Sequence, residues 1–134
     1  PYLEPKKAHA IRVPLVKFDD LLSQSHIVTF HVPLTDETRH MANSEFFAKM
    51  KRGAYLINAS RGAVVDPIAL LGALDSGHLA GAALDVFEEE PLPQNSPLLR
   101  NDKIIVTPHV AGQTTESVEK ISLEAAQTVF KFLE

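Results

Sequence analysis

The chain has 134 residues, of which 45% are hydrophobic and 22% charged, and its formal net charge is −4; these values suit one soluble globular domain with its own core. It has no cysteine, so disulfide bonds and thiolate metal sites are excluded. Lysine and arginine never cluster beyond a pair, which argues against nucleic acid as a partner. No apolar run approaches membrane-spanning length, so we expect a cytoplasmic protein with no membrane or nucleic-acid partner.

In chain order, residues 1–17 are polar and irregular, and residues 18–24 predict a short helix. The β-branched and aromatic segment 26–31 predicts a strand. An Asn-Ser pair can then cap a helix within residues 43–53, which a glycine stops. Residues 55–58 are the next apolar run and predict a second strand.

The second half of the chain repeats this alternation. An Asp-Pro pair starts a helix over residues 66–77, which a glycine ends. Residues 79–86 predict a third strand, 88–102 a polar loop and 103–107 a fourth strand. Thr114 or its neighbour caps a long amphipathic final helix, with apolar residues spaced three to four positions apart.

This order of strands and helices predicts an α/β fold with a parallel sheet. The strands are continuous apolar runs, which is typical of a parallel sheet buried on both faces. Open parallel sheets bind ligands beyond the carboxyl ends of their strands. The residues of interest therefore follow each strand, at 31–33, 58–61, 85–90 and 108–112.

These strand ends carry groups suited to acid–base chemistry on a carboxylate-bearing substrate. Arg61 is a permanent cation whose forked donors match a planar carboxylate. His109 can exchange a proton near neutral pH, and a carboxylate from the run 88–90 could orient it. Gly62 and Gly112 permit a ligand to approach the backbone closely.

Each residue taken alone also has a structural interpretation. Arg61 could be a surface cation paired with Asp66, and His109 a hydrogen-bonded structural histidine. The glutamate run could be a solvated loop, and Asp85 a turn or cap residue. His31 and His40, which have no visible carboxylate partner, are interpreted as structural. No histidine-rich spacing predicts a metal site.

Four segments together resemble the D-isomer-specific 2-hydroxyacid dehydrogenases. They are residues 50–66 (MKRGAYLINASRGAVVD), 31–41 (HVPLTDETRHM), 81–93 (GAALDVFEEEPLP) and 107–112 (TPHVAG). The resemblance covers nearly the whole chain. It implies a Rossmann-like parallel sheet with flanking helices, and an NAD-dependent oxidoreductase that interconverts D-2-hydroxy acids and 2-keto acids by hydride transfer.

The resemblance implies three catalytic residues. Arg61, in the NxxRG pattern, would bind the substrate carboxylate and polarise the reacting carbonyl. His109, in the PHxxG pattern, would be the acid–base residue. Glu90, which directly precedes Pro91, would pair with His109 and keep it protonated. No metal is implied.

The resemblance also implies a set of cofactor-binding residues. Asp85 and the backbone around the second and fourth strand ends would line the nicotinamide side of NAD, and two residues would flank the adenosine and pyrophosphate side. The set is Pro33, Thr38, Ala59, Ser60, Arg61, Asp85, His109 and Gly112. NADP in place of NAD stays open.

The chain also departs from the family pattern. The dinucleotide fingerprint GxGxxG is absent from the 134 residues, and so is the acidic residue that reads the ribose hydroxyls. Residues 1–3 resemble the segment that follows that acidic position. We therefore expect residues 1–134 to be a partial NAD-binding domain that lacks the first two strands, the Gly-rich loop and the substrate domain, and to be inactive alone.

Two related functions remain as alternatives. One is an NADH-sensing transcriptional corepressor, which would retain the same three residues. The other is a formate dehydrogenase-like enzyme, against which Glu90 speaks because glutamine replaces it there. The substrate would be a small 2-hydroxy or 2-keto acid of unspecified identity, and the full-length protein would be a homodimer.

Overall fold

The computed structural model describes residues 13–133, so the predictions for residues 1–12 lie outside it. The helices and strands, in chain order, are α2 (Phe18–Gln24), β1 (Ile27–Phe30), α3 (Ser44–Lys49), β2 (Tyr55–Asn58), η1 (Gly62–Val64), α4 (Pro67–Asp75), β3 (Gly81–Leu84), η2 (Pro97–Arg100), β4 (Ile104–Val106) and α5 (Thr115–Leu133).

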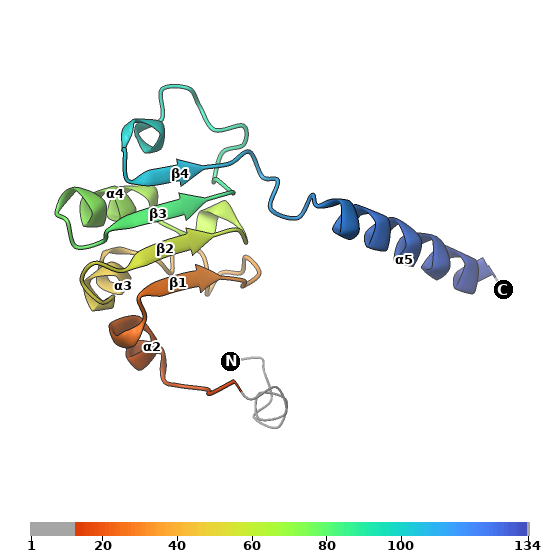
Figure 1. Ribbon diagram of the computed structural model, residues 1–134, viewed down its shortest axis with the longest axis horizontal. Coiled ribbons are helices and arrows are strands. Elements are labelled where there is room, and N and C mark those ends of the chain that lie inside the picture. Colours follow the sequence, from red (N-terminus) through yellow and green to blue (C-terminus); the bar gives the residue numbers. More distant parts are fainter. Residues whose placement is uncertain (1–12, 134) are drawn as a thin grey trace.

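The strands form one parallel sheet of four strands in the order β1-β2-β3-β4 (Figure 1). All the pairings are parallel: Phe30 lies opposite Asn58, and Asn58 lies opposite Leu84. The carboxyl ends of the strands therefore meet at one rim of the sheet. The predicted α/β fold with a parallel sheet is confirmed.

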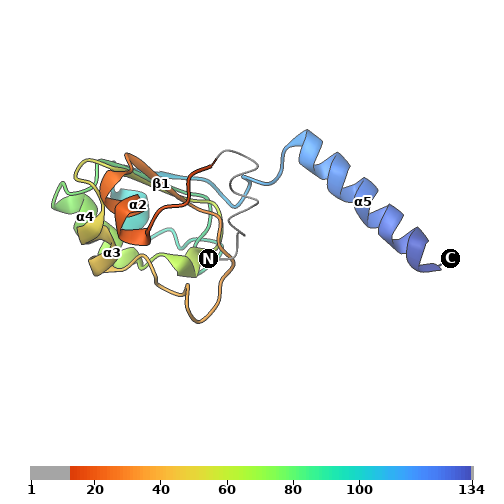
Figure 2. The ribbon, with the colours of Figure 1, turned by 90° about the horizontal axis from the view of Figure 1, so that it is seen from below.

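Helices α2, α3 and α4 lie on one face of the sheet (Figure 2). Each strand-to-strand crossover steps in the same direction along the sheet, and right-handed crossovers in one direction place their helices on one face. The residues that point toward the helices are buried, whereas Ile27, Tyr55 and Ile105 on the other face are 58%, 50% and 70% exposed. Within the described residues the expectation of a sheet buried on both faces is wrong.

The core lies between the sheet and these helices. It is built from leucine and phenylalanine side chains of both layers, of which the largest fully buried ones include Leu22, Phe47, Leu56, Leu70 and Leu74. Burial of such side chains is the main favourable term in folding. The rigid layer so formed fixes the strand ends that carry the polar residues.

The helix boundaries follow their caps. The side chain of Asn43 accepts a hydrogen bond from the N–H of Phe46, and that of Asp66 accepts from Ile68 and Ala69. Both N-caps were predicted. Helix α3 nevertheless ends at Lys49 rather than continuing toward Gly53.

Strand β2 matches its predicted run at both ends. Strands β1, β3 and β4 lie within their predicted runs but are shorter. The two 3-10 helices, η1 and η2, were not predicted. Ser96, whose hydroxyl accepts from the N–H of Leu98, and Pro97 start η2, which is the same start signal as at α4. The last helix, α5, extends away from the sheet (Figure 1) and has no buried residue.

Candidate active site

Arg61 lies in a turn that Asn58 organises. Asn58 is 1% exposed, and its Oδ1 accepts hydrogen bonds from the N–H and the hydroxyl of Ser60 at 3.1 and 2.8 Å. Its Nδ2 donates to the carbonyl of Arg61 at 3.0 Å. The buried amide of Asn58 therefore fixes the backbone on both sides of the Ser60–Arg61 peptide.

The Arg61 guanidinium makes one contact within this turn, from Nη1 to the carbonyl of Ser60 at 2.6 Å. Within residues 13–133 no ion pair of Arg61 is found, and the Asp66 carboxylate caps α4 instead. The alternative interpretation of Arg61 as a partner of Asp66 is therefore wrong. Guanidinium donors remain for an external carboxylate.

Asp85 holds the segment that carries His109. The carboxylate is 6% exposed. Oδ1 accepts from the Thr107 hydroxyl and from the N–H of Val110 at 2.9 Å, and Oδ2 accepts from the N–H of Ala111 at 2.9 Å. Burial alone would raise the pKa of Asp85, but these hydrogen bonds outweigh it and lower the pKa below its usual value. The carboxylate is therefore charged and structurally engaged.

His109 is presented in an unusual backbone conformation. Its φ is 57°, in the left-handed region that few residues other than glycine adopt. The hydrogen bonds of Asp85 to the two residues that follow hold the chain in this conformation. Backbone conformations of this kind cluster at functional sites.

The His109 ring pairs with Glu90. Nδ1 of His109 lies 2.8 Å from Oε2 of Glu90, while Oε1 accepts from the N–H of Phe87 at 2.9 Å. The contact with His109 and, to a smaller extent, the hydrogen bond from the Phe87 N–H lower the pKa of Glu90. Desolvation acts in the opposite direction but is weaker. Of the three glutamates in the run, Glu90 is the one whose carboxylate contacts the ring. That contact fixes the ring orientation, with Nε2 as its other nitrogen.

Arg61, Glu90 and His109 line the same hollow, of about 290 Å³. The lining residues are Leu34, Arg61, Gly62, Ala63, Val86, Phe87, Glu88, Glu90 and His109. We call this the candidate hollow. The structure thus brings together three residues that stand at three different strand ends in the sequence.

Gly62 lets two of these strand ends touch. A Cβ atom at Gly62 would lie 1.9 Å from the carbonyl carbon of Phe87 and 2.4 Å from the N–H nitrogen of Glu88. The close approach predicted at Gly62 is therefore an approach to the neighbouring loop. At Gly112, by contrast, an added Cβ would meet no atom within 4 Å.

The residues predicted for the adenosine side also form a defined turn. The Thr38 hydroxyl donates to the carbonyl of Pro33 at 2.7 Å and accepts from the N–H of Thr35 at 2.8 Å. The turn follows β1 at the same rim as the candidate hollow. Ala59 is exposed at the next strand end, where a small side chain leaves space for a ligand.

His40 has a carboxylate partner, Glu88. Its Nε2 lies 3.3 Å from Oε2 of Glu88, and Nη1 of Arg39 lies 3.5 Å from Oε1 of the same glutamate. His31 contacts the hydroxyl of Thr29 at 3.1 Å. The interpretation of His40 as lacking a carboxylate partner is wrong.

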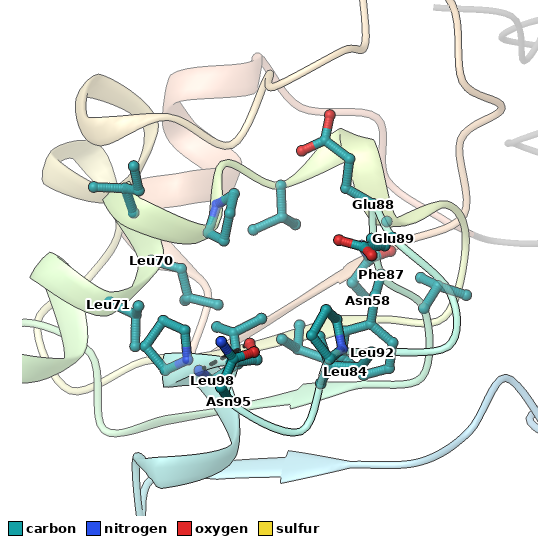
Figure 3. Close-up of a pocket in the computed structure, with 18 residues that line it drawn as sticks. Asn58, Leu70, Leu71, Leu84, Phe87, Glu88, Glu89, Leu92, Asn95 and Leu98 are labelled. Atoms are coloured by element: carbon teal, nitrogen blue, oxygen red, sulfur yellow. Dashed lines mark hydrogen bonds between the residues drawn. The ribbon is translucent and has the colours of Figure 1, made fainter.

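A larger cavity, of about 570 Å³, lies beside the candidate hollow. Figure 3 shows Leu70 and Leu71 of α4 on one side of it and Phe87, Glu88 and Glu89 on the other. It is mostly apolar and contains none of Arg61, Glu90 and His109. The chemistry therefore points to the smaller hollow, and loop 86–90 is the wall between the two.

None of the helices in residues 13–133 is both long enough and apolar enough to span a membrane. In the same residues, no group of three histidine or carboxylate side chains is placed to bind a metal ion.

Comparisons with known proteins identify the family of the chain. Residues 1–111 match the model of the D-isomer specific 2-hydroxyacid dehydrogenase NAD-binding domain. The chain is 49% identical over 124 residues to a glyoxylate reductase of Thermofilum pendens, covering 90% of this chain and 37% of the reductase. It spans well under half the length of the curated relatives it matches.

Solved structures agree with this assignment. A D-lactate dehydrogenase of Aquifex aeolicus, in complex with NAD and lactic acid, matches with a TM-score of 0.83 and 35% identity over 99% of this chain and 44% of that one. A D-isomer specific 2-hydroxyacid dehydrogenase of Xanthobacter autotrophicus Py2, in complex with NADPH and MES, matches with a TM-score of 0.68 and 53% identity over 70% and 30%. The chain therefore belongs to the D-isomer specific 2-hydroxyacid dehydrogenase family, and its similarity lies in the NAD-binding domain.

Proposed function

We propose that the chain is part of an NAD-dependent oxidoreductase that interconverts D-2-hydroxy acids and 2-keto acids. The observation that carries the proposal is the contact between His109 and Glu90, 2.8 Å long, in a hollow that Arg61 also lines. An acid–base histidine with a carboxylate partner and a guanidinium that can bind a carboxylate are the groups that reduction of a 2-keto acid requires of the protein.

Each side chain has a separate task in this proposal. Arg61 binds the substrate carboxylate through two parallel hydrogen bonds and so orients the adjacent carbonyl. His109 gives a proton from Nε2 to the carbonyl oxygen as the carbon is reduced, and takes it back in the reverse direction. Glu90, bound at Nδ1, stabilises the protonated ring and holds its plane.

The rim residues fit a nicotinamide dinucleotide. Pro33 and Thr38 form the turn beyond β1, and exposed Ala59 leaves room beyond β2. Asp85 would act on the nicotinamide end mainly through the backbone of residues 107–112, because both of its oxygens already accept hydrogen bonds from them. The cofactor, when bound, supplies or accepts the hydride.

The proposal extends to the protein as a whole. Residues 1–134 form part of a cofactor domain, and the Gly-rich loop and substrate domain belong to other parts of a longer chain. Relatives solved with NAD and with NADPH leave both cofactors as candidates. We propose a cytoplasmic homodimer for the full-length enzyme, which sedimentation of that enzyme would test.

The test is an assay of NADH and NADPH oxidation by the full-length protein with a panel of 2-keto acids: glyoxylate, hydroxypyruvate, phosphohydroxypyruvate and pyruvate. We expect turnover with at least one of them and its loss in His109→Asn. If the folded protein binds NADH but reduces none of the panel, the dehydrogenase proposal fails. Binding without turnover would favour the corepressor alternative.

A further inference from the structure

Glu88 connects two segments, of which the first directly follows Leu34 of the candidate hollow and the second lines the hollow. One is the turn 35–41, which carries Arg39 and His40, and the other is loop 86–90, which carries Glu90. Glu88 contacts the His40 ring with one oxygen, at 3.3 Å, and the Arg39 guanidinium with the other, at 3.5 Å. The partners stand 48 residues apart in the sequence, so the contact is purely tertiary.

The His40 end of this connection is fixed to the Arg61 turn. The N–H of His40 donates to the carbonyl of Ala63 at 2.7 Å, and the N–H of Ala42 donates to the carbonyl of Val64 at 3.1 Å. Both acceptors lie in η1, directly after Arg61. The position of the His40 ring therefore follows the position of the segment that carries Arg61.

The Glu88 end is fixed to Glu90. The N–H of Phe87, the residue before Glu88, donates to Oε1 of Glu90, whose other oxygen contacts His109. The backbone of Phe87 and Glu88 also lies against Gly62 without space for a Cβ. A displacement of Glu88 would therefore be passed to the Glu90 carboxylate.

The backbone of His40 supports a specific role for its side chain. Its φ is 49°, a conformation that is unfavourable for a residue with a Cβ and that glycine adopts freely. In this conformation the ring faces Glu88. A glycine would adopt this backbone conformation with less strain, but it has no side chain to contact Glu88.

We propose that Glu88 is a positioning residue: His40 and Arg39 hold it, and it keeps loop 86–90 against the Arg61 turn so that Glu90 meets His109. The three side chains are 41% to 52% exposed, so their pairing adds little to the free energy of unfolding. The pairing of Glu88 with Arg39 and His40 acts instead on the position of the Glu90 carboxylate relative to His109. Only the catalytic consequence of this inference rests on the proposed function.

The test uses the charge of Glu88 to separate position from electrostatics. In the 134-residue chain, the Glu90 carboxyl is titrated by carbon NMR in the wild type, in Glu88→Ala and in Glu89→Ala. Loss of a neighbouring negative charge alone lowers the pKa of Glu90 further. Release of the loop weakens the contacts with His109 and Phe87 and raises it. Glu89→Ala is the matched control, because it removes the same charge from the same loop.

We expect the pKa of Glu90 to rise in Glu88→Ala and to stay or fall in Glu89→Ala. His40→Gly is a second variant, since it relieves the left-handed conformation, keeps all three glutamates and should fold; it should also raise the pKa of Glu90. The double variant, with Glu88→Ala and His40→Gly together, should raise the pKa of Glu90 little more than either single substitution does. A pKa of Glu90 that falls or stays in Glu88→Ala and does not rise in His40→Gly would overturn the inference.

A kinetic measurement then tests the consequence for catalysis. In the full-length enzyme, Glu88→Ala should lower kcat roughly tenfold, since small displacements of catalytic groups are costly. KM for the 2-keto acid should stay unchanged because Arg61 is untouched. Since unfolding would also raise the pKa of Glu90 toward its ordinary value, circular dichroism of Glu88→Ala must match the wild type, which separates a released loop from a general loss of folded protein. Absence of turnover in the wild type would count against the proposed function only, and the titration would still decide the role of Glu88.

Discussion

The carboxylate of Glu90 contacts Nδ1 of His109 with one oxygen and the N–H of Phe87 with the other. One side chain thus orients the histidine ring and ties it to the loop that borders Gly62. Both oxygens of Glu90 are in use, so replacing the carboxylate alters the ring and the loop together. This relationship makes Glu90 the first residue to test.

Glu90→Gln in the full-length enzyme should lower kcat by about 10-fold to about 100-fold. The amide keeps the size of the side chain but removes the negative charge that stabilises the protonated ring. Loss of the proton donor itself, in His109→Asn, should cost more, about 100-fold to 10,000-fold. Steady-state kinetics of both variants test this order. Equal losses would mean that Glu90 does more than assist His109.

The lowered pKa of Glu90 also predicts a pH dependence of stability. A carboxyl group whose pKa is lower in the folded state contributes stability above its unfolded pKa, and loses it as pH falls through the folded pKa. Because Glu90 is 36% exposed and His109 51%, we expect the contribution to be below about 1 kcal/mol. Urea unfolding of wild type and Glu90→Gln should converge in acid; a constant difference at all pH values would contradict this.

Asp85→Asn should destabilise the chain more than Glu90→Gln does. The buried carboxylate accepts from Thr107, Val110 and Ala111, and an amide would turn one acceptor into a donor that faces a donor. An unsatisfied buried group of this kind costs about 1–3 kcal/mol. Denaturant unfolding at neutral pH measures the loss, and Thr107→Val, which removes a single donor, is the milder control.

The pKa of Asp85 is lowered as well, so its contribution to stability changes with pH in the same direction as that of Glu90. Its stabilising contribution is present above the unfolded pKa of an aspartate and disappears as pH falls through the lower folded pKa. The difference between wild type and Asp85→Asn should therefore shrink only in strong acid. If the difference vanished already at neutral pH, the three hydrogen bonds to Asp85 would not contribute as described.

Much of the fold was predictable because its signals are local. The apolar run 55–58 matches β2 at both ends, and the Asp66-Pro67 pair starts α4 where expected. These elements follow from hydrogen-bonding geometry within a few residues. The resemblance likewise singled out Glu90 among three adjacent glutamates, a choice that composition and spacing alone do not make.

The contacts that complete the site were not predictable, because they join distant segments. Glu88 meets His40 only when loop 86–90 folds back over the turn 35–41, and no local pattern marks that return. Gly62 was expected to face a ligand, but what lies against it is the Phe87 backbone. The exposed face of the sheet was not predicted either. Apolar runs indicate buried strands, but the direction of the crossovers decides which face of the sheet receives helices.

Gly62→Ala should be strongly destabilising, and Gly112→Ala should not. An added Cβ at Gly62 overlaps the backbone of Phe87 and Glu88, so loop 86–90 must move, whereas the same atom at Gly112 meets nothing within 4 Å. Overpacking of this kind costs about 1–3 kcal/mol. The melting temperatures of the two variants test this, because each substitution adds a single methyl group and only its position differs. Equal melting temperatures would show that the loop yields without cost.

Arg61→Lys should impair substrate binding and leave the fold intact. The guanidinium makes its one described contact to the neighbouring Ser60 carbonyl, and α4 is capped by Asp66, so little stability depends on it. A lysine cannot make the paired hydrogen bonds to a carboxylate; losing one charged hydrogen bond costs about 1.5–3 kcal/mol, or roughly 10-fold to 100-fold in kcat/KM. Arg52→Lys, before β2 at the opposite rim of the sheet, is the matched control. We expect the loss with 2-keto acids to appear in Arg61→Lys alone, with both melting temperatures unchanged; wild-type kcat/KM in Arg61→Lys would remove Arg61 from substrate binding.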